Sequence, residues 1–416
     1  MAASYEQLDR PATSAYFERV TVRARLMLTV CVATAACTHT TVVPPAELRA
    51  DALATVGEGR GESPGLVVAT VRMSDPDAAK IEVEAGGYAA LADHRPTDVD
   101  TAFLWFSITK LFTATAIMQL HERGQLDIDA PVKDLLGDEF VLDEPRRRPI
   151  TARDLLSHSS GLGSPSVWAA AAPEGQERRT VKVQLAGLLE RHGPRLRYRP
   201  GTNQRYSNLG YMVLGRMIEV ADGRDYETYV SEEILDVLGM DHSGFRWAPL
   251  LGNAAIGHGR KGGFWTTVAK SVANPEVFGP SLPNWITTVY FEVEGSPYGG
   301  LIGTAGDLAK FLGAHLHYGA WEGHRILTAA SVQAMQTPQL DQNGRPLDYA
   351  LGWHTQVIEG QRYFNHMGKG GGYRPEVRIW PSHHYGVVIL TNRTRYDPRP
   401  LSQCVPPAPD PSRSAE

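Results

Sequence analysis

The sequence predicts an α/β (α+β) fold: an antiparallel sheet built from N- and C-terminal strands and flanked by helices, with an inserted mainly helical subdomain. Two observations lead to this prediction. Short β-rich runs occur over 66–85 and again in the last third of the chain, whereas the middle is mainly helical. This order is typical of one sheet whose strands come from both ends of the chain. The 416 residues, 42% of them hydrophobic, can form a large core.

The N-terminal part of the sheet is predicted from two β-rich runs that follow a helix. Residues 46–56 have a helical pattern that ends at a group of glycines. Residues 66–71 form an apolar, β-branched run, which is typical of a strand. Residues 80–85 alternate between apolar and polar types, as in a half-buried strand. Because a turn-rich segment over 74–77 separates the two runs, we expect a hairpin.

The helical middle begins at Ser107. Residues 107–123 are apolar on nearly all sides, so this helix should be buried, and Gly124 lies where a glycine commonly ends a helix. Residues 130–247 have the pattern of helical fragments joined by Gly/Pro turns. Residues 248–298 are rich in Gly and Pro and give no clear assignment.

The last third of the chain predicts one helix and then a series of strands. The helix is expected over 300–316 and is entered through Thr304. Short β-rich runs with tight turns between them follow over 351–358, 363–367, 376–380 and 386–391.

These elements divide the chain into five segments. In chain order they are an N-terminal extension with a signal- or lipoprotein-like segment, a linker, a sheet subdomain made of two separate stretches, a mainly helical subdomain, and a disordered Pro-rich tail. Their expected boundaries are 1–37, 38–45, 46–106 together with 299–393, 107–298, and 394–416.

The N-terminal segment has the pattern of an export signal. Arg23 and Arg25 precede an apolar run over 26–36, which has the length of a signal-peptide core and is too short to span a bilayer. The run ends in small residues, and 35–37 is a weak match to a lipoprotein box. We therefore expect export to the cell envelope or periplasm, with membrane attachment through Cys37 as an open alternative. A buried N-terminal helix is the other interpretation.

Charge and cysteine content indicate no nucleic-acid partner and no cofactor. The net charge is -5, which gives no basic footprint for nucleic acid. Cys31, Cys37 and Cys404 lie near the ends of the chain, so the body of the protein offers no thiolate metal site. No His-Glu-x-x-His or paired-ligand spacing occurs either, and we expect no metal.

Ser107 and Lys110 form the first candidate catalytic pair. Residues three apart on a helix share one face. A serine hydroxyl becomes a good nucleophile only when a neighbour accepts its proton. A buried lysine can accept it, because burial lowers its pKa. This is the only Ser-x-x-Lys in the chain. The alternative is a helix-capping serine beside a lysine that reaches solvent.

Tyr206 and Asn208 form the second candidate group. They lie between a turn over 199–202 and the apolar start of a helix, where a tyrosine can reach into a cleft. Tyr363 and Asn365 have the same spacing but lie on a predicted strand. We therefore prefer Tyr206 and interpret Tyr363 as an ordinary sheet residue.

His366, Gly368 and Lys369 form the third group. His366 ends a predicted strand and begins a glycine-rich run over 366–372. Glycines there allow close approach of a substrate backbone. The same His-x-Gly tripeptide at His242 and His317 lacks this context.

Taken together, the order Ser-x-x-Lys, Tyr-x-Asn and His-x-Gly resembles the serine β-lactamase, penicillin-binding protein and carboxylesterase family. The likeness is strongest to its class C-like branch, which includes D-alanyl-D-alanine carboxypeptidases and related esterases. This family's sequence pattern is also matched by further runs over 155–162, 200–202 and 299–308. The resemblance extends from about residue 46 to about residue 393.

The resemblance implies a β-lactamase/transpeptidase-like fold and serine hydrolase chemistry. Ser107 would attack a carbonyl and form an acyl-enzyme. Lys110 and Tyr206 would share the proton transfers, with Lys110 keeping Tyr206 partly ionised. Substrates would be small esters, amides or D-amino-acid peptides, with weak β-lactamase activity as a further option. The alternative is a catalytically silent protein on the same fold that binds peptidoglycan or peptides.

The resemblance also implies substrate-binding roles. Asn208 would bind the acyl-side amide or hold the catalytic lysine. The backbone N–H groups of Ser107 and Lys369 would form the oxyanion hole, with Gly368 beside them and His366 on the opposite wall.

Two departures from the family pattern affect these expectations. Many β-lactamases have Lys-Thr-Gly as the third motif, and this chain has none. Because a histidine is mostly uncharged at neutral pH, His366 favours esterase or peptidase activity over β-lactam hydrolysis.

The family usually ends with a helix on the sheet, whereas this chain becomes Pro-rich after Asn392. We therefore expect either that the N-terminal helix alone covers the sheet or that the chain is truncated.

An α/β-hydrolase is the rival enzyme class. Residues 61–65 match Gly-x-Ser-x-Gly. That motif needs a strand before the serine and a helix after it. Here a predicted helix precedes and a predicted strand follows, so we reject this interpretation.

Overall fold

The computed structural model describes most of the chain between residues 44 and 396. The described ranges are 44–59, 61–75, 78–140, 148–164, 171–192, 196–262 and 274–396. All of them belong to one compact unit, residues 41–416. The predicted signal-like segment over 1–37, most of the predicted linker and the tail from residue 397 lie outside the described residues.

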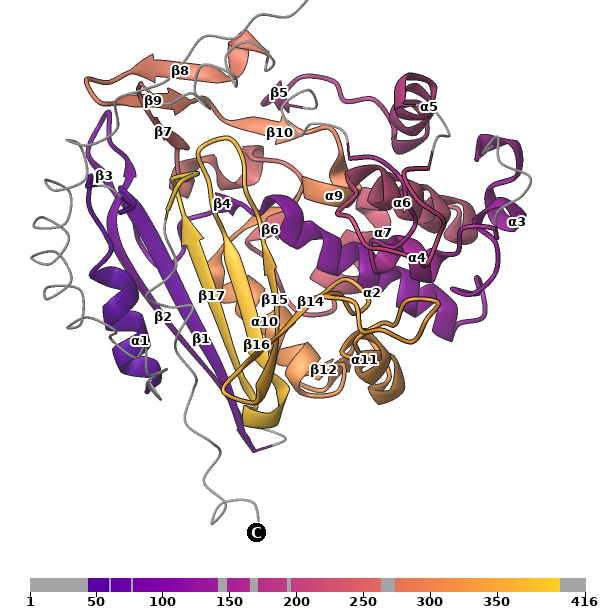
Figure 1. Cartoon of the computed structure of the whole chain (residues 1–416). Helices are drawn as coiled ribbons and strands as arrows, with labels where there is room; N and C mark the ends of the chain where they lie inside the picture. The colour runs from indigo at the N-terminus through magenta and orange to yellow at the C-terminus, as the bar shows by residue number, and fades with distance from the viewer. Residues whose placement is uncertain are drawn as a thin grey trace, which may run out of the picture. The chain divides into compact units, whose positions relative to one another are not determined.

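A seven-stranded antiparallel sheet is formed by strands from both ends of the chain (Figure 1). This confirms the predicted fold class. The N-terminal hairpin is also confirmed, with Val67 opposite Ala85. The first strand of that hairpin pairs with the last strand of the chain, with Leu66 opposite Thr391. In sheet order the strands are β14 (His354–Ile358), β15 (Gln361–Met367), β16 (Glu376–Trp380), β17 (Tyr385–Thr391), β1 (Gly65–Asp75), β2 (Ala78–Ala90) and β3 (Arg95–Pro96).

The two faces of this sheet belong to different apolar clusters. Side chains alternate along a strand, so Val67 and Ala69 of β1 join the main core, whereas Leu66 and Val68 join a smaller cluster on the other face. The helix α10 (Ala305–Leu316) packs on the main-core face, and α1 (Pro45–Leu53) packs on the other (Figure 1). Among the described residues, α1 is the helix that covers this second face.

The helical part surrounds one central helix, α2 (Thr109–Glu122). It follows a short 3₁₀ turn, η1 (Phe106–Ile108), and its residues 109–120 are all buried, as the apolar sequence predicts. Gly124 follows it with φ +69°, which a glycine adopts without strain. The surrounding elements are α3 (Val132–Leu136), η2 (Gly137–Glu139), α4 (Ala152–Leu156), α5 (Val181–His192), α6 (Asn208–Asp222), α7 (Tyr226–Val230) and the π-helical turn η4 (Ser231–Leu235).

The segment before α10 differs from the prediction. A helix was expected from residue 300, but α10 begins only after Thr304, whose side chain accepts a hydrogen bond from the Asp307 backbone N–H. The preceding residues form β11 (Ile302–Gly303), which pairs with β4 (Phe103–Leu104) and β6 (Ser243–Gly244). The pairing partners are distant in sequence, so local pattern could not indicate this strand.

The region without a sequence assignment forms short strands and turns. Residues 263–273 lie outside the described part. The rest contains η5 (Ala248–Asn253), β7 (His258–Arg260), η6 (Pro275–Val277), β8 (Phe278–Ser281), β9 (Trp285–Thr288), β10 (Phe291–Val293) and α9 (Ser296–Gly299). β10 pairs with β5 (Ala171–Pro173). The remaining elements are β12 (Ala320–Trp321), β13 (His324–Arg325), α11 (Ala329–Met335) and η7 (Pro381–His383).

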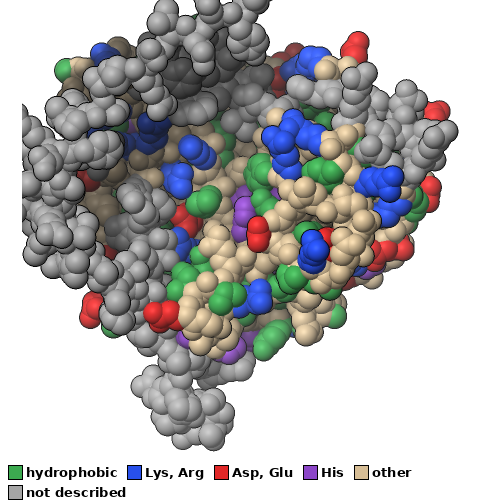
Figure 2. Space-filling model, in the orientation of Figure 1, with side chains coloured by type: hydrophobic (Ala, Val, Ile, Leu, Met, Phe, Trp, Pro, Cys, Tyr) green, Lys and Arg blue, Asp and Glu red, His purple; other side chains and the backbone are tan. Residues whose placement is uncertain are grey.

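The described residues contain neither a membrane-spanning helix nor a cluster of metal ligands. None of their helices has the length and apolar character needed to cross a membrane. They also hold no group of three or more His, Cys, Asp or Glu side chains placed to bind a metal ion. On the face shown in Figure 2, acidic and basic side chains both occur across the described surface.

Candidate active site

Ser107 lies at the junction between η1 and α2 and is partly exposed. The preceding residue, Phe106, has φ +47°, a conformation that is rare for a bulky side chain. Neighbouring contacts hold this turn in place: the Trp105 backbone N–H donates to Leu301 O (2.8 Å), and its indole N–H donates to Gly303 O (3.0 Å). The turn thereby places the Ser107 hydroxyl at the start of the buried helix and at the protein surface.

Lys110 is fully buried beside Ser107. Its Nζ lies 3.2 Å from Ser107 Oγ and donates to Tyr298 O at 2.8 Å. The rings of Tyr206, Tyr211 and Tyr298 surround the amine at 4.8, 5.4 and 5.3 Å from their centroids. Burial lowers the pKa of Lys110 well below its usual value. The group next to the serine is therefore poised to accept a proton.

Tyr206 reaches the same point from the loop before α6. Its hydroxyl is buried beside the Ser107 hydroxyl. Burial raises the Tyr206 pKa, and the neighbouring Ser107 hydroxyl opposes this by lowering it. Burial thus favours the neutral form of both Tyr206 and Lys110. This differs from the expectation that Lys110 keeps Tyr206 partly ionised, because desolvation dominates both groups.

Asn208 is buried in the first turn of α6, two residues after Tyr206. The preceding Ser207 caps this helix by accepting a hydrogen bond from the Gly210 backbone N–H at 2.9 Å. The Asn208 backbone N–H donates to Ser164 Oγ at 3.2 Å. The structure therefore places Asn208 at the start of α6, close in sequence to Tyr206, and its role towards substrate stays a prediction.

The glycine-rich end of β15 rests against the turn that carries Ser107. A Cβ on Gly368 would lie 2.3 Å from Trp105 O, and one on Gly370 would lie 2.5 Å from the Phe106 ring. Lys369, between these glycines, is exposed. This explains the glycines as sites of close backbone approach. The oxyanion-hole role of the Ser107 and Lys369 N–H groups stays a prediction.

His366 is fully buried in the wall of the site, 6.4 Å from the Tyr206 ring between centroids. Burial lowers its pKa well below the usual histidine value, and the nearby His354 and Lys110 lower it further. An uncharged His366 agrees with the expectation that it is a weak anchor for a carboxylate.

Two further histidines contact the site and were not singled out as site residues. The His158 ring lies 4.5 Å from the Tyr206 ring, and the His354 ring lies 5.1 Å from the His366 ring. Burial lowers the His354 pKa to about 4. His158 lies inside the run over 155–162 that carries part of the family resemblance, which is the signal that could have identified it. For His354 we find no comparable signal in the sequence.

The α9 turn supplies a contact to Lys110 that the sequence did not reveal, the carbonyl of Tyr298. Its position is fixed from two sides. The Thr113 hydroxyl of α2 donates to Pro297 O at 2.6 Å. On the other side Arg178, whose side chain is buried, pairs with Glu227 at 2.7 Å, and the Ser296 hydroxyl donates to the same carboxylate.

The two motifs that the sequence analysis set aside, the second Tyr-x-Asn and the Gly-x-Ser-x-Gly match, have structural roles. Tyr363 points to the second face of the sheet, where its ring stacks on Trp380 at 5.6 Å. Ser63, of the Gly-x-Ser-x-Gly match, is fully buried and donates to Gly65 O at 2.8 Å. Neither group is available to substrate at the Ser107 site.

A half-open cavity of about 530 Å³ lies away from these residues. It lies between the ends of α10 and α11, the middle of β15 and η7. His315, Tyr318, Gln336, Arg362, Phe364 and His384 are among the residues that line it. None of the predicted site residues does, so this cavity is not the candidate active site.

Comparisons with known proteins identify the family of this chain. The beta-lactamase family profile matches residues 50–402. The "Unguisins hydrolase ungD" of Aspergillus violaceofuscus is 27% identical over 354 residues, which cover 80% of this chain and 58% of that protein. "Penicillin-binding protein 4" of Amycolatopsis lactamdurans is 28% identical over 313 residues, covering 72% of this chain and 75% of that protein. The chain thus spans just over half the length of the first of these relatives.

Solved structures show the same fold. D-amino acid amidase from Ochrobactrum anthropi superposes with a TM-score of 0.67 at 18% identity, covering 86% of this chain and 96% of that one. A class C beta-lactamase superposes with a TM-score of 0.62 at 18% identity, covering 82% and 89%. Because the family profile matches residues 50–402, which are most of the sequence, the chain belongs to the beta-lactamase family.

Proposed function

We propose that this protein is a serine hydrolase that cleaves small esters, amides or D-amino-acid peptides through an acyl-enzyme on Ser107. One observation carries the proposal: the buried amine of Lys110 lies 3.2 Å from Ser107 Oγ and burial favours its neutral, proton-accepting form. A nucleophile beside a desolvated base at a partly exposed position is the arrangement that acyl transfer needs.

The proposed reaction begins with attack of Ser107 Oγ on the substrate carbonyl carbon while its proton passes to Lys110 Nζ. Tyr206 then relays a proton to the departing amine or alkoxide, which leaves the acyl group on Ser107. In the second half, a water molecule attacks the acyl carbon while it gives up a proton to the same pair. The bond between that carbon and Ser107 Oγ then breaks, the proton returns from the pair to Ser107 Oγ, and the acid is released. The developing oxyanion would accept hydrogen bonds from the Ser107 and Lys369 backbone N–H groups.

The name of the Ochrobactrum relative favours a D-amino-acid amide as the first substrate to test. That protein is described as a D-amino acid amidase. The absence of Lys-Thr-Gly and the uncharged His366 favour ester or amide substrates over β-lactams. Efficient penicillin hydrolysis is therefore not expected.

The test is the Ser107→Ala variant together with covalent labelling. Wild-type protein should hydrolyse a short-chain p-nitrophenyl ester, and Ser107→Ala should not. Intact mass spectrometry after separate incubation with a fluorophosphonate, a penicillin and a D-alanyl-D-alanine peptide would show which acyl groups attach, and peptide mapping would place them. Turnover retained by Ser107→Ala would reject Ser107 as the nucleophile. A folded wild type without turnover or labelling would favour the silent peptide-binding alternative.

We further propose that the protein is exported to the cell envelope or periplasm. The support is the pattern of Arg23 and Arg25 followed by the apolar run over 26–36. Mass spectrometry of the mature N-terminus after expression in a bacterial host would test this. Cleavage before Cys37 with a lipid mass would indicate membrane attachment, and an uncleaved N-terminus in the cytoplasm would contradict export.

A further inference from the structure

His158 occupies an unusual backbone position at the end of α4. It has φ +57°, in the left-handed region that few residues other than glycine adopt. Such a conformation persists only where surrounding contacts hold it. The ring is buried, with 1% of the residue exposed.

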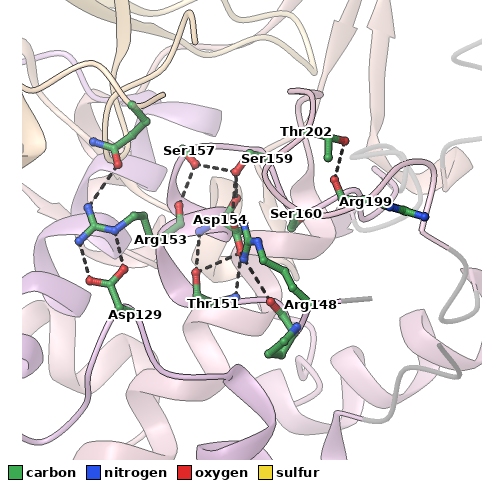
Figure 3. A network of polar contacts seen from close by, with 12 residues as sticks. Asp129, Arg148, Thr151, Arg153, Asp154, Ser157, Ser159, Ser160, Arg199 and Thr202 are labelled. Atoms are coloured by element: carbon green, nitrogen blue, oxygen red, sulfur yellow. Dashed lines mark hydrogen bonds and ion pairs between the residues drawn. The ribbon is translucent and has the colours of Figure 1, made fainter. Parts of the chain in front are cut away.

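A polar network on α4 provides those contacts (Figure 3). Asp154 forms a capping box with Thr151 and a bidentate ion pair with Arg148, both contacts at 2.7 Å. The same carboxylate accepts a hydrogen bond from Ser159 Oγ at 3.2 Å, and Ser159 lies 3.0 Å from Ser157 Oγ. Ser159 is thus tied directly to the buried carboxylate, and Ser157 is linked to it through Ser159, so that both neighbours of His158 are held where the chain leaves the helix.

From this position His158 contacts the loop that carries Tyr206 on both sides of the tyrosine. Its carbonyl accepts a hydrogen bond from the Arg205 backbone N–H at 2.9 Å. Its ring Nδ1 accepts one from the Ser207 backbone N–H at 3.2 Å. Its ring also packs on the Tyr206 ring, with 4.5 Å between centroids. His158 therefore holds the Tyr206 ring and the residues on both sides of it.

These contacts also define the form of the imidazole. Because Nδ1 accepts a hydrogen bond, the ring proton lies on Nε2. Burial lowers the His158 pKa well below its usual value, which agrees with a neutral ring. A protonated ring could not accept the Ser207 N–H.

We propose that His158 is a positioning residue for Tyr206: it fixes the loop over 205–207 and the tyrosine ring so that the phenol stays at Ser107. The proposal rests on the proposed function, since it assigns His158 a part in the proton transfers of that site. His158 itself transfers no proton. The Arg148–Asp154–Ser159 network is the support that keeps it in place.

The test compares three substitutions. His158→Ala removes the ring and its acceptor. His158→Asn keeps an acceptor near the Nδ1 position and tolerates the left-handed backbone. His158→Phe keeps an aromatic ring but cannot accept the Ser207 N–H. A matched control is His315→Asn, at another buried histidine, whose Nε2 lies 3.3 Å from Thr115 Oγ1 of α2.

The measured quantity is kcat per active site, with active sites counted by fluorophosphonate labelling. Because misplacement of a catalytic group by about 1 Å can cost on the order of 10²-fold, we expect His158→Ala to lose roughly 10- to 100-fold in kcat with KM nearly unchanged. His158→Asn should recover part of this loss and exceed His158→Phe. His315→Asn should lower Tm but keep its kcat per labelled site. A purely structural role for His158 would lower Tm and the labelled fraction while kcat per labelled site stayed at the wild-type value.

Two outcomes would overturn the proposal. One is a kcat per labelled site in His158→Ala within about threefold of the wild type. If that variant does not fold, His158→Phe carries the same comparison. The other is a crystal structure of either variant in which the Tyr206 hydroxyl has not moved. Failure of the proposed function would be seen in the wild type alone, because Ser107 would then not be labelled. In that case the crystal structure of a variant would still test whether His158 positions Tyr206.

Discussion

At the residue scale, the central feature is a buried lysine, Lys110, to which the described residues supply no carboxylate partner. The described contacts of Lys110 Nζ are a serine hydroxyl, a backbone carbonyl and aromatic rings. A buried ammonium is costly unless it is paired with an opposite charge. Desolvation therefore favours the neutral amine, and the same environment that weakens folding supplies a base for Ser107.

The first prediction concerns replacement of this lysine by Lys110→Met. Because burial lowers the Lys110 pKa below its usual 10.5, the unfolded chain holds more protons than the folded chain between the two values. Wild-type stability should therefore rise with pH through this window. In Lys110→Met that contribution is absent, so the Tm of the variant relative to the wild type should fall steadily as the pH is raised from about 7 to about 10.

Thermal melts across this pH range would measure the effect, and Lys80→Met, at an exposed position, is the control. Ester hydrolysis by Lys110→Met should drop by at least about 10²-fold. A Tm difference that does not change with pH would contradict a lowered Lys110 pKa.

The second prediction concerns Tyr206→Phe. Loss of the phenol should reduce kcat by on the order of 10²–10⁴ if this group transfers protons. Tyr363→Phe is the matched control, because that tyrosine has the same Tyr-x-Asn context but lies on the other face of the sheet, with its hydroxyl bonded to Gln356. Equal kcat values for the two variants would contradict an acid–base role of Tyr206.

At the element scale, the site depends on the junction of β15 with η1. A helix presents Ser107 and Lys110 on one face, but the wall opposite them comes from the end of a strand more than two hundred residues later. Only residues without a Cβ allow these two segments to approach as closely as they do. The glycines at this junction are thus part of the geometry of the site.

The third prediction is that Gly368→Ala impairs catalysis more than folding. The new Cβ would lie 2.3 Å from Trp105 O and 2.6 Å from a Pro375 carbon, so the strand end must move away from the Ser107 turn. We expect kcat to fall by on the order of 10²-fold, as for a misplaced catalytic group.

Steady-state kinetics with active-site labelling would measure this loss. Gly252→Ala is the control, since its Cβ would meet nothing within 4 Å. If kcat in Gly368→Ala matched that control, the strand end would not be part of the site.

At the scale of the whole molecule, the second face of the sheet forms an apolar cluster separate from the core that surrounds the candidate nucleophile. The main cluster includes Phe106, Ile108 and Leu111 around the nucleophile. The smaller cluster on the second face joins Leu48 and Ala52 of α1 to the sheet. Arg49, also on this helix, is buried and pairs with Glu84 at 2.6 Å and Glu82 at 2.9 Å. This face fastens the N-terminal helix and contributes no predicted catalytic group.

The fourth prediction follows from this separation. Leu48→Ala removes a side chain that is 1% exposed, and such truncations cost about 2–5 kcal/mol in the free energy of unfolding. We expect this loss in urea unfolding, while kcat per labelled site stays at the wild-type value. A large fall in kcat per labelled site, at a temperature where the variant is folded, would show that the two faces are coupled.

The sequence by itself determined the features that depend on local pattern. The i, i+3 spacing places Ser107 and Lys110 on one helical face, and the apolar character of 107–123 predicts its burial; both are found in the structure. The alternating and β-branched runs at both ends of the chain predict the strands of the sheet. The preference for Tyr206 over Tyr363 also came from local context, a loop against a strand.

Only the tertiary structure decided which distant groups complete the site. The carbonyl that accepts the Lys110 hydrogen bond is 188 residues away in sequence, and the His158 nitrogen that holds the Tyr206 loop is 49 residues from its partner Ser207. The degree of desolvation, which sets the pKa of Lys110 and of Tyr206, likewise depends on everything packed around them. Local periodicity carries no information about such contacts, because they arise from the way loops and helices distant in the chain pack together.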